Sequence, residues 1–459
     1  MSLTVKKLSY KLVFQFLTIT LVVFYATRVI AVSEDENLNR SVPLDSFLNP
    51  LSNLNNEELD QFILGKSFFR IPWVEAPSAT SARDGLGPLF NANTCLSCHK
   101  KNGRGKVFQS DNVVSRSNIF KLSIPNNKSL EHIIQIQSNG IIEEPNYGSQ
   151  ININAATGVE FEGKPNIDYQ YIPFTYPDGN EVTLRKPFLK LTHLNYGELN
   201  PNTFISSRIA SPLIGLGLIE QISDAQILEN EDIDDINGDG ISGKANRVWS
   251  RQTNKFEIGK YTWKASSPSI KHQVANAALN DMGLTNPIYP LENCTQRQDN
   301  CLNAPKGKGD FDLTPERLDA MSFYLTHLKI PSSVSADKFG AKLFDSIGCS
   351  GCHKASYEIN EQRIYPYSDF LLHDMGSDLS DKREEFSAKG SEWRTAPLWF
   401  TLNTSVILGE DKNFLHDGRA RTIEEAILWH GGEAKKSKEL FINLSHDNRL
   451  KIINFVNQI

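Results

Sequence analysis

The spacing of apolar residues predicts two similar amphipathic helices that lie far apart in the chain. In residues 313–323 apolar positions recur at helical intervals, and Thr314 followed by Pro315 is a typical helix start. Residues 444–455 repeat this pattern, with Ser445 in the place of the N-cap. Each helix is therefore expected to close one half of the chain.

A long stretch before the first of these helices has the pattern of strands. Residues 120–124 and 132–136 are short apolar or alternating runs of the kind found in strands. Residues 177–180, with the sequence Pro-Asp-Gly-Asn, predict a hairpin turn. We therefore expect a β-containing insertion over residues 106–201, which could form a lid, a substrate surface or a structural wall.

Two segments combine a pair of cysteines with an adjacent histidine. They are Cys95-Leu96-Ser97-Cys98-His99 and Cys349-Ser350-Gly351-Cys352-His353. At this spacing each thiol can add to one haem vinyl group, and the histidine then lies under the iron as its axial ligand. A lone CxxC also occurs in redox dithiols and zinc sites, but two copies that are each followed by histidine favour covalent haem. The sequence therefore predicts two c-type haems, with His99 and His353 as iron ligands.

The surroundings of the two motifs suggest an internal duplication. Each half contains, in the same order, a glycine-to-phenylalanine segment, an arginine followed by Pro-Leu, and a closing helix. These segments are 65–69, 208–213 and 313–323 in the first half, and 340–344, 394–398 and 444–455 in the second. Because three matches in one order are hard to obtain by chance, we expect a mainly α chain of two cytochrome-c-like helical haem domains. The β-containing insertion enlarges the first domain.

Composition and the N-terminus set the domain plan and the compartment. The 459 residues carry a formal net charge of -6, which gives no support to nucleic-acid binding. Three lysines before an apolar run over residues 12–26 predict a signal peptide cleaved after Ala31, and the run is shorter than the roughly 20 residues of a membrane span. We expect a bacterial protein that is periplasmic or otherwise exported, without a permanent membrane span. The expected divisions are a signal peptide (1–31), a linker (32–55), an N-terminal haem domain (56–330) and a C-terminal domain (334–459), joined near residues 331–333.

The remaining cysteines and an acidic loop predict two further features. Of six cysteines, Cys294 and Cys301 are not used by the haem motifs, and an exported protein would let them form a disulfide. Residues 235–246 match the front half of a calcium loop, with oxygen ligands from Asp235, Asn237 and Asp239 and the backbone carbonyl of Ile241. The last loop position is Asn246 rather than glutamate, so an ion-free turn is the alternative to calcium.

Five segments of the chain together resemble the bacterial di-haem oxidoreductase family. They are residues 91–99 (NANTCLSCH), 211–220 (SPLIGLGLIE), 235–246 (DINGDGISGKAN), 260–265 (KYTWKA) and 414–420 (FLHDGRA). That family is distantly related to the di-haem cytochrome c peroxidases, to MauG and to the di-haem rubber oxygenase. The resemblance implies a two-domain c-haem fold, calcium near the domain boundary and chemistry at the N-terminal haem. It does not fix the substrate, because these relatives differ in reaction.

A histidine at the end of a predicted helix is the expected sixth ligand of the C-terminal haem. Thr422 and Glu425 form a capping-box pattern, and His430 falls on the apolar face just before two glycines. The related peroxidases carry methionine or tyrosine at the corresponding place, whereas histidine resembles the rubber oxygenase. Bis-His ligation should give a lower potential than His/Met ligation. The rival ligands are Met375, His373 and His416, and a buried structural role for His430 is the other alternative.

The N-terminal haem is expected to be open, because no histidine or methionine lies between His99 and His132. An open iron needs a nearby group that moves protons during peroxide or dioxygen chemistry. We expect Glu220 in this role, since the family motif ends on it and a related glutamate serves peroxidases. The alternatives are Glu231, Gln150, and a merely exposed helix-end glutamate.

A tryptophan is the expected electron bridge between the haems. Trp263 lies in the 260–265 motif, and related peroxidases and MauG place a tryptophan between their haems. Packing in the core is the alternative role, and Trp249 is a rival bridge.

Three functions fit these features. The expected one is a di-haem peroxidase that takes electrons from a small redox protein at the C-terminal haem and reduces hydrogen peroxide at the N-terminal haem. A second is oxidation of a protein or organic substrate with peroxide or dioxygen. The third is a di-haem electron carrier without catalysis, which the large first half does not favour.

Overall fold

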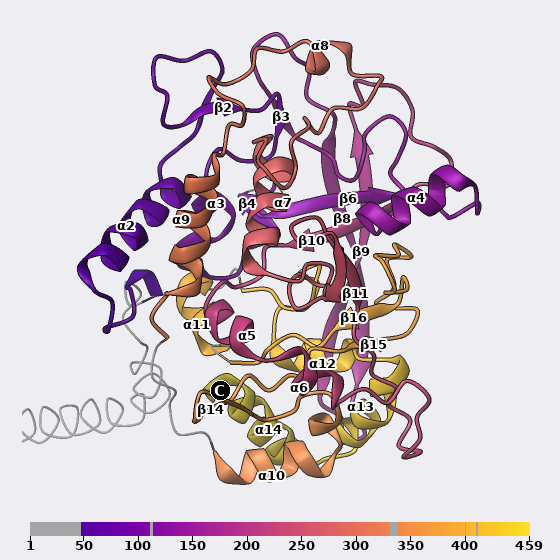
Figure 1. The fold of residues 1–459 in the computed structure, drawn as a ribbon. Coiled ribbons are helices and arrows are strands. Elements are labelled where there is room, and N and C mark those ends of the chain that lie inside the picture. Colours follow the sequence, from indigo (N-terminus) through magenta and orange to yellow (C-terminus); the bar gives the residue numbers. More distant parts are fainter. Residues whose placement is uncertain (1–46, 111–112, 331–336, 400, 410–411) are drawn as a thin grey trace, which may run out of the picture. The chain divides into compact units, whose positions relative to one another are not determined.

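The computed structural model describes residues 47–110, 113–330, 337–399, 401–409 and 412–459 (Figure 1). All of these residues belong to one unit, Leu44–Ile459. The predicted signal peptide, most of the predicted linker and the predicted domain junction at residues 331–333 lie outside the described residues. Within the described ranges, no helix is both long and apolar enough to cross a membrane.

Helices and strands alternate along the whole described chain. The helices are α2 (Asn56–Arg70), α3 (Cys95–Cys98), η3 (Lys100–Asn102), α4 (Leu130–Asn139), α5 (Leu216–Gln221), α6 (Asp224–Leu228), α7 (Ile270–Met282), α8 (Asp299–Leu302), α9 (Pro315–Thr326), α10 (Lys338–Ser346), η4 (Cys349–Gly351), α11 (Thr401–Leu408), α12 (Ile423–Trp429), η6 (Gly432–Ala434), α13 (Lys435–Ile442) and α14 (His446–Gln458). The strands are β1 (Val74–Glu75), β2 (Asp84–Leu86), β3 (Leu89–Phe90), β4 (Phe108–Ser110), β5 (Val113–Val114), β6 (Asn118–Ser123), β7 (Asn154–Ala155), β8 (Lys164–Thr175), β9 (Glu181–Thr192), β10 (Phe204–Ile209), β11 (Arg247–Ser250), β12 (Lys255–Ile258), β13 (Tyr357–Ile359), β14 (Gln362–Ile364), β15 (Leu372–Asp374) and β16 (Glu392–Arg394).

The fold is mixed α/β, with 31% helix and 20% strand. The prediction of a mainly α chain built from two cytochrome-c-like helical domains is therefore wrong. The strands form two-stranded ladders, and four of these ladders, β1–β2, β11–β12, β13–β14 and β15–β16, lie wholly outside the predicted insertion. Strands of three or four residues carry too few positions for a period of two to be recognised in the sequence.

Two helix pairs nevertheless repeat across the chain. α2 packs on α9, and a side chain at Gly65 would overlap the backbone of Ala320, so the two helices touch at their backbones (Figure 1). α10 packs on α14 in the same way, with Gly340 against the carbonyl of Lys451. Glycine permits this close approach because it has no Cβ. In each half, the helix with the glycine segment thus packs on the closing helix.

Helix caps explain where these closing helices begin. Thr314 is the N-cap of α9 and Pro315 its first residue, although the Thr314 side chain makes no capping hydrogen bond. The Ser445 side chain accepts from the backbone N–H of Asn448 at the start of α14. Both predicted helix starts are therefore confirmed.

The predicted insertion contains both a correct and an incorrect element. β8 and β9 form a twelve-residue antiparallel hairpin closed at residues 176–180, as predicted, and β6 covers the run at 120–124. The run at 132–136, predicted as a strand, lies instead in α4, where the Ser129 side chain caps the N-terminus and Gly140 ends the helix at φ 76°. Those two caps are the signal that outweighs the apolar run.

The hairpin contacts the C-terminal half. Tyr176 donates its hydroxyl to Glu424 at 2.9 Å, and Asp178 pairs with Arg449 at 2.7 Å. Arg449 also lies over the Tyr176 ring at 3.7 Å. These contacts tie the hairpin tip to α12 and α14, which favours the structural-wall interpretation for this part of the insertion.

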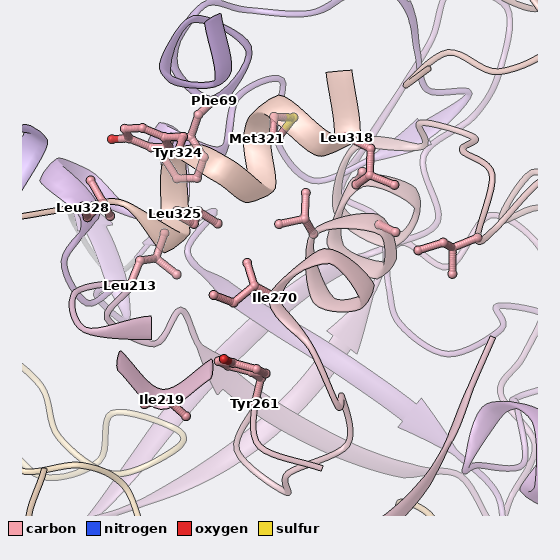
Figure 2. Close-up of a cluster of buried hydrophobic side chains, with 14 of the residues drawn as sticks. Phe69, Leu213, Ile219, Tyr261, Ile270, Leu318, Met321, Tyr324, Leu325 and Leu328 are labelled. Atoms are coloured by element: carbon pink, nitrogen blue, oxygen red, sulfur yellow. The ribbon is translucent and has the colours of Figure 1, made fainter. Parts of the chain in front are cut away.

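The largest hydrophobic cluster gathers around α9 and α7. Figure 2 shows Leu318, Met321 and Leu325 of α9 on one side of it, with Ile219, Tyr261 and Ile270 on the other. Phe69 and Tyr324 lie together at its edge, 5.3 Å apart between ring centroids. Several of these side chains also line the main cavity described below, so the core builds the apolar wall of the site.

Candidate functional site

The N-terminal CxxCH segment is a single capped turn. The Thr94 side chain accepts from the Ser97 backbone N–H at 3.1 Å, which starts α3, and His99 follows at its end. The His99 imidazole uses Nδ1 to bond the carbonyl of Ser211 at 2.9 Å. The ring of Phe69, from α2, lies 6.5 Å from the His99 ring. This arrangement fixes the imidazole plane.

The C-terminal CxxCH segment repeats these supports. His353 uses Nδ1 to bond the carbonyl of Tyr367 at 2.9 Å, and Phe344 of α10 lies 6.1 Å from its ring. Phe344 in turn contacts Phe455 of α14 at 5.3 Å. Burial lowers the pKa of His353 to about 4, so the imidazole is neutral, as an iron ligand must be.

The four motif cysteines have the chemistry of buried thiols. Cys95, Cys98, Cys349 and Cys352 are all free. Burial raises the pKa of Cys95 and of Cys349 to about 12, and it also raises the pKa of the other two thiols. A redox dithiol or zinc ligand needs a readily formed thiolate, which these environments oppose.

His430 lies at the end of α12, as the helix pattern predicted. Its Nδ1 bonds the carbonyl of Ala426 at 2.7 Å, and burial lowers its pKa. It is close enough to His353 to depress the pKa of that imidazole as well. Half of the predicted capping box forms: Thr422 accepts from the Glu425 N–H at 3.0 Å, while the Glu425 carboxylate bonds Arg421.

The rival ligands differ in how they are engaged. Both ring nitrogens of His373 are bound, to Asp369 at 2.8 Å and Glu433 at 2.7 Å, so neither is free for iron. His416 stacks on Trp393 at 3.6 Å, and burial lowers its pKa to about 3. Met375 packs against the cluster that contains Trp429 and Phe344, its carbonyl lies against Gly431, and it remains a rival.

The residues present fit haem. His99, His353 and His430 are each held through Nδ1 by a backbone carbonyl, and the backbone of Gly103 also interacts with His99. This is the arrangement that orients a histidine for an iron atom, because the bound Nδ1–H fixes the tautomer that leaves Nε2 as the ligand. The His99, Cys95 and Cys98 side chains also face one large cavity.

That cavity has a volume of about 1020 Å³. Its apolar wall includes Phe69, Leu213, Ile219 and Met321, from the core cluster of Figure 2. Its polar wall carries arginines and carboxylates from distant parts of the chain. They are Arg104, Glu143, Arg208, Arg251, Asp281, Glu292, Arg383, Glu385 and Arg394. The N-terminal motif therefore opens on a space large enough for a cofactor and a small ligand.

One three-residue stretch places Trp263 beside this motif. The indole Nε1 of Trp263 donates to the carbonyl of Ile209 at 2.8 Å, and His99 bonds the carbonyl of Ser211 two residues on. The two side chains are therefore anchored to carbonyls two residues apart, and both line the cavity. Trp263 also packs against the hydrophobic cluster that contains Phe344 and touches Cys349. Its rival Trp249 lines the cavity too and stacks on Phe256 at 5.3 Å.

Glu220 reaches the cavity through a tyrosine. Its carboxylate accepts a short hydrogen bond from the hydroxyl of Tyr261, and Tyr261 lines the cavity. Burial and the neighbouring carboxylate raise the Tyr261 pKa well above its ordinary value. Tyr261 was not predicted as a site residue. The sequence signal that could have found it is its position in the motif KYTWKA, two residues before Trp263.

The alternatives to Glu220 are engaged elsewhere. Glu231 pairs with Arg247 at 3.1 Å and accepts from the Ala245 N–H. Gln150 is bound through both ends of its amide, to Lys121 and to Asn280. Neither alternative lies among the side chains that line the cavity.

The predicted calcium loop is exposed, and its side chains are turned toward its own backbone. Asp235 accepts from the Gly240 N–H, Asn237 from Asp239, and Asp239 from Ile241. Over the described ranges, no group of three or more His, Cys, Asp or Glu residues is arranged to hold a metal ion. Ile241, at the end of the loop, lies against Gly351 of the C-terminal motif. The calcium prediction stays untested.

The last predicted pair is a disulfide. Cys294 and Cys301 are bonded, with Cα atoms 5.8 Å apart. Cys294 also lines the cavity, so the bridge holds part of its rim.

Sequence reasoning missed a buried ion network behind the cavity. Arg208 pairs with Asp381 at 2.5 Å and Glu385 at 3.1 Å, and Lys264, fully buried, pairs with Asp381 at 3.2 Å. Arg383 pairs with Glu385 at 3.1 Å. These charges come from segments more than a hundred residues apart, so no local pattern could have announced them.

Comparison with known proteins identifies a family over nearly the whole chain. The family described as "Di-haem oxidoreductase, putative peroxidase" matches residues 37–459. No curated protein matches the chain. A solved structure of Kuenenia stuttgartiensis hydrazine synthase, pressurized with 20 bar xenon, is similar at 14% identity and a TM-score of 0.23, covering 47% of this chain and 84% of that one.

Proposed function

The chain belongs to the di-haem oxidoreductase family, and on that premise we propose that it is a peroxidase-like enzyme that reduces hydrogen peroxide at its N-terminal motif. Bound haems would supply electron transfer at the C-terminal motif and peroxide reduction at the N-terminal one. The observation that supports this most directly is that His99 lines the cavity with Cys95 and Cys98, whereas His353 does not line it and has His430 nearby. A histidine pair suits electron transfer, and an exposed position suits a substrate.

The absence of a sixth ligand at the N-terminal motif is part of this proposal. His272 lines the cavity, but its two nitrogens bond Ser267 and Tyr289. His132 lies on α4, where Nδ1 accepts from the Asn127 N–H, and it is the residue best placed to contradict an open iron.

Protons for the reaction would come through Tyr261. Reduction of hydrogen peroxide to two waters consumes two electrons and two protons, so a proton donor must reach the cavity. Tyr261 lines the cavity, and the Glu220 carboxylate, which accepts the hydrogen bond of the Tyr261 hydroxyl, orients that hydroxyl. We therefore assign proton delivery to Tyr261 and a positioning role to Glu220.

Trp263 is proposed as the electron bridge. It is bound beside His99 through the Ile209–Ser211 stretch and packs on the cluster around the C-terminal motif. The electron donor would be a small redox protein, and we propose that the chain works outside the bacterial cytoplasm, where c-type haem is attached.

Turnover with peroxide tests this proposal. Purified protein is mixed with a reduced small cytochrome and hydrogen peroxide, and oxidation of the cytochrome is followed by its absorbance. We expect turnover together with a high-spin ferric signal from one haem at rest. Two six-coordinate haems without peroxide turnover would show an electron carrier instead. A His132→Ala variant that gains the high-spin signal would identify His132 as a sixth ligand.

A further inference from the structure

Arg104 has a buried guanidinium group without a counter-charge. Its side chain is 9% exposed and lines the cavity together with Cys95, Cys98 and His99. Nη1 donates to the carbonyl of Leu415 at 3.3 Å, while Nε has no hydrogen-bond partner. Burial alone lowers the Arg104 pKa to about 10, since no carboxylate of the described residues acts on it.

Two other arginines in the same wall are paired with carboxylates, whereas Arg394 resembles Arg104 in having an unpartnered Nε and no ion pair among the described residues. Arg208 contacts two carboxylates, at 2.5 and 3.1 Å, and Arg383 contacts Glu385 at 3.1 Å. Burying a charge without a partner costs several kcal/mol, about as much as the penalty for breaking a buried ion pair. The chain thus neutralises Arg208 and Arg383 by itself and leaves Arg104 charged toward the cavity.

Aromatic contacts orient Arg104 without neutralising it. The guanidinium carbon lies 5.2 Å from the Trp263 ring centroid and 5.8 Å from that of Phe414. Such cation–π contacts contribute about 0.5–2 kcal/mol, less than the cost of burying the charge. The aromatic rings therefore hold the guanidinium in place, and a bound anion is needed to complete the site.

We propose that Arg104 binds a propionate carboxylate of the haem attached at Cys95 and Cys98. This inference rests on the proposed function, because it requires haem at the N-terminal motif. Arg104 follows His99 by five residues, across η3, so the chain holds the guanidinium near the motif. The forked donors of arginine match a carboxylate in two parallel hydrogen bonds. An anionic substrate would use the same chemistry, and the experiment separates the two sources.

The test compares three variants of the haem-loaded protein by redox titration and resonance Raman spectroscopy. In Arg104→Gln, we expect a lower midpoint potential at one haem and shifted propionate bending modes, because the lost positive charge no longer favours the reduced state. Arg104→Lys keeps the charge, so its potential should shift less while the propionate modes still change. Arg297→Gln removes an exposed charge from the cavity rim and should leave both measurements unchanged.

The experiment separates failure of this inference from failure of the proposed function. Haem staining of denatured protein first counts the attached haems, and absence of haem at the N-terminal motif would overturn the proposed function and this inference together. With both haems attached, unchanged potentials and Raman modes in Arg104→Gln and Arg104→Lys would overturn this inference alone. Unchanged spectra with weaker saturation by an anionic electron donor would assign Arg104 to a substrate. If Arg104→Gln does not fold, the propionate bending modes of Arg104→Lys test the inference, and unchanged modes overturn it.

Discussion

The two CxxCH segments share their supports but differ in what each histidine faces. His99 and His353 are each fixed by a backbone carbonyl and by a phenylalanine from a glycine-bearing helix, which packs on a closing helix. His353 lies near a second histidine, His430, whereas His99 opens on a cavity of about 1020 Å³. The same local scaffold thus carries an enclosed site and an open one.

The two sites differ in what surrounds the motifs. The residues that hold each motif repeat in both halves, but part of the cavity wall comes from residues without a counterpart in the second half. Tyr261 and Arg104 are among them. The motifs themselves therefore do not decide which of the two faces the cavity.

The largest expected effect is the loss of one haem. Replacing Cys349 and Cys352 by alanine removes both attachment thiols of the enclosed site, so covalently bound haem should fall by half. Haem staining of denaturing gels and a pyridine haemochrome assay measure this. The double variant Cys294→Ala/Cys301→Ala is the control, because it removes a disulfide and should retain both haems. Full stain in the variant without Cys349 and Cys352 would contradict the assignment.

The second expected effect would make the enclosed site resemble the open one. His430→Ala should change one haem from low spin to high spin and leave the other unaltered, as read by absorbance and electron paramagnetic resonance. Met375→Leu is the matched control from the same cluster. If the Met375 variant changes the spin state and the His430 variant does not, methionine is the ligand.

Proton delivery is expected only at the open site. Tyr261→Phe removes the hydroxyl that faces the cavity and should lower kcat for peroxide by about 100-fold, within the range typical of general acid–base catalysis. Glu220→Gln should give a smaller loss, because the hydroxyl remains. Tyr289→Phe, which removes another cavity hydroxyl, is the control. Equal turnover rates for Tyr261→Phe and the wild type would refute proton delivery by Tyr261. The spectrum of the C-terminal haem should stay unchanged in all three variants.

Electron transfer between the two sites should be slower without Trp263. Trp263→Phe keeps most of the apolar volume but removes the easily oxidised indole, so electron transfer between the haems should slow about tenfold while the fold persists. Rapid reduction followed by absorbance at each haem measures the rate. Trp249→Phe is the matched comparison, and a larger effect there would make Trp249 the bridge.

The smallest expected effect is that of calcium. Chelation should lower Tm by about 1 °C, consistent with about 1 kcal/mol of lost binding in a chain of this length. It should disturb the enclosed site more than the open one, because Ile241 lies against Gly351. Asp239→Ala should mimic chelation. Indifference of Tm to both treatments would identify the loop as an ion-free turn.

Local signals in the sequence were sufficient for features that depend on a few neighbouring residues. The β8–β9 turn and the helix starts at Thr314 and Ser445 are confirmed, since caps and turns are decided within four residues. The run at 132–136 was misread as a strand, because its own residues favour a strand and the caps at Ser129 and Gly140 were not weighed. Short ladders such as β15–β16 left no periodic trace at all.

The sequence by itself determined the two CxxCH motifs, the family and the position of His430 at a helix end, because each depends on spacing along one stretch of chain. Only the tertiary structure decided the mixed α/β fold, the cavity and its lining. It also decided that Glu220 accepts a hydrogen bond from Tyr261 and that Arg104 lacks the carboxylates that neutralise Arg208. The physical reason is that burial and charge pairing depend on residues brought together from distant segments, and no local pattern records which ones will meet.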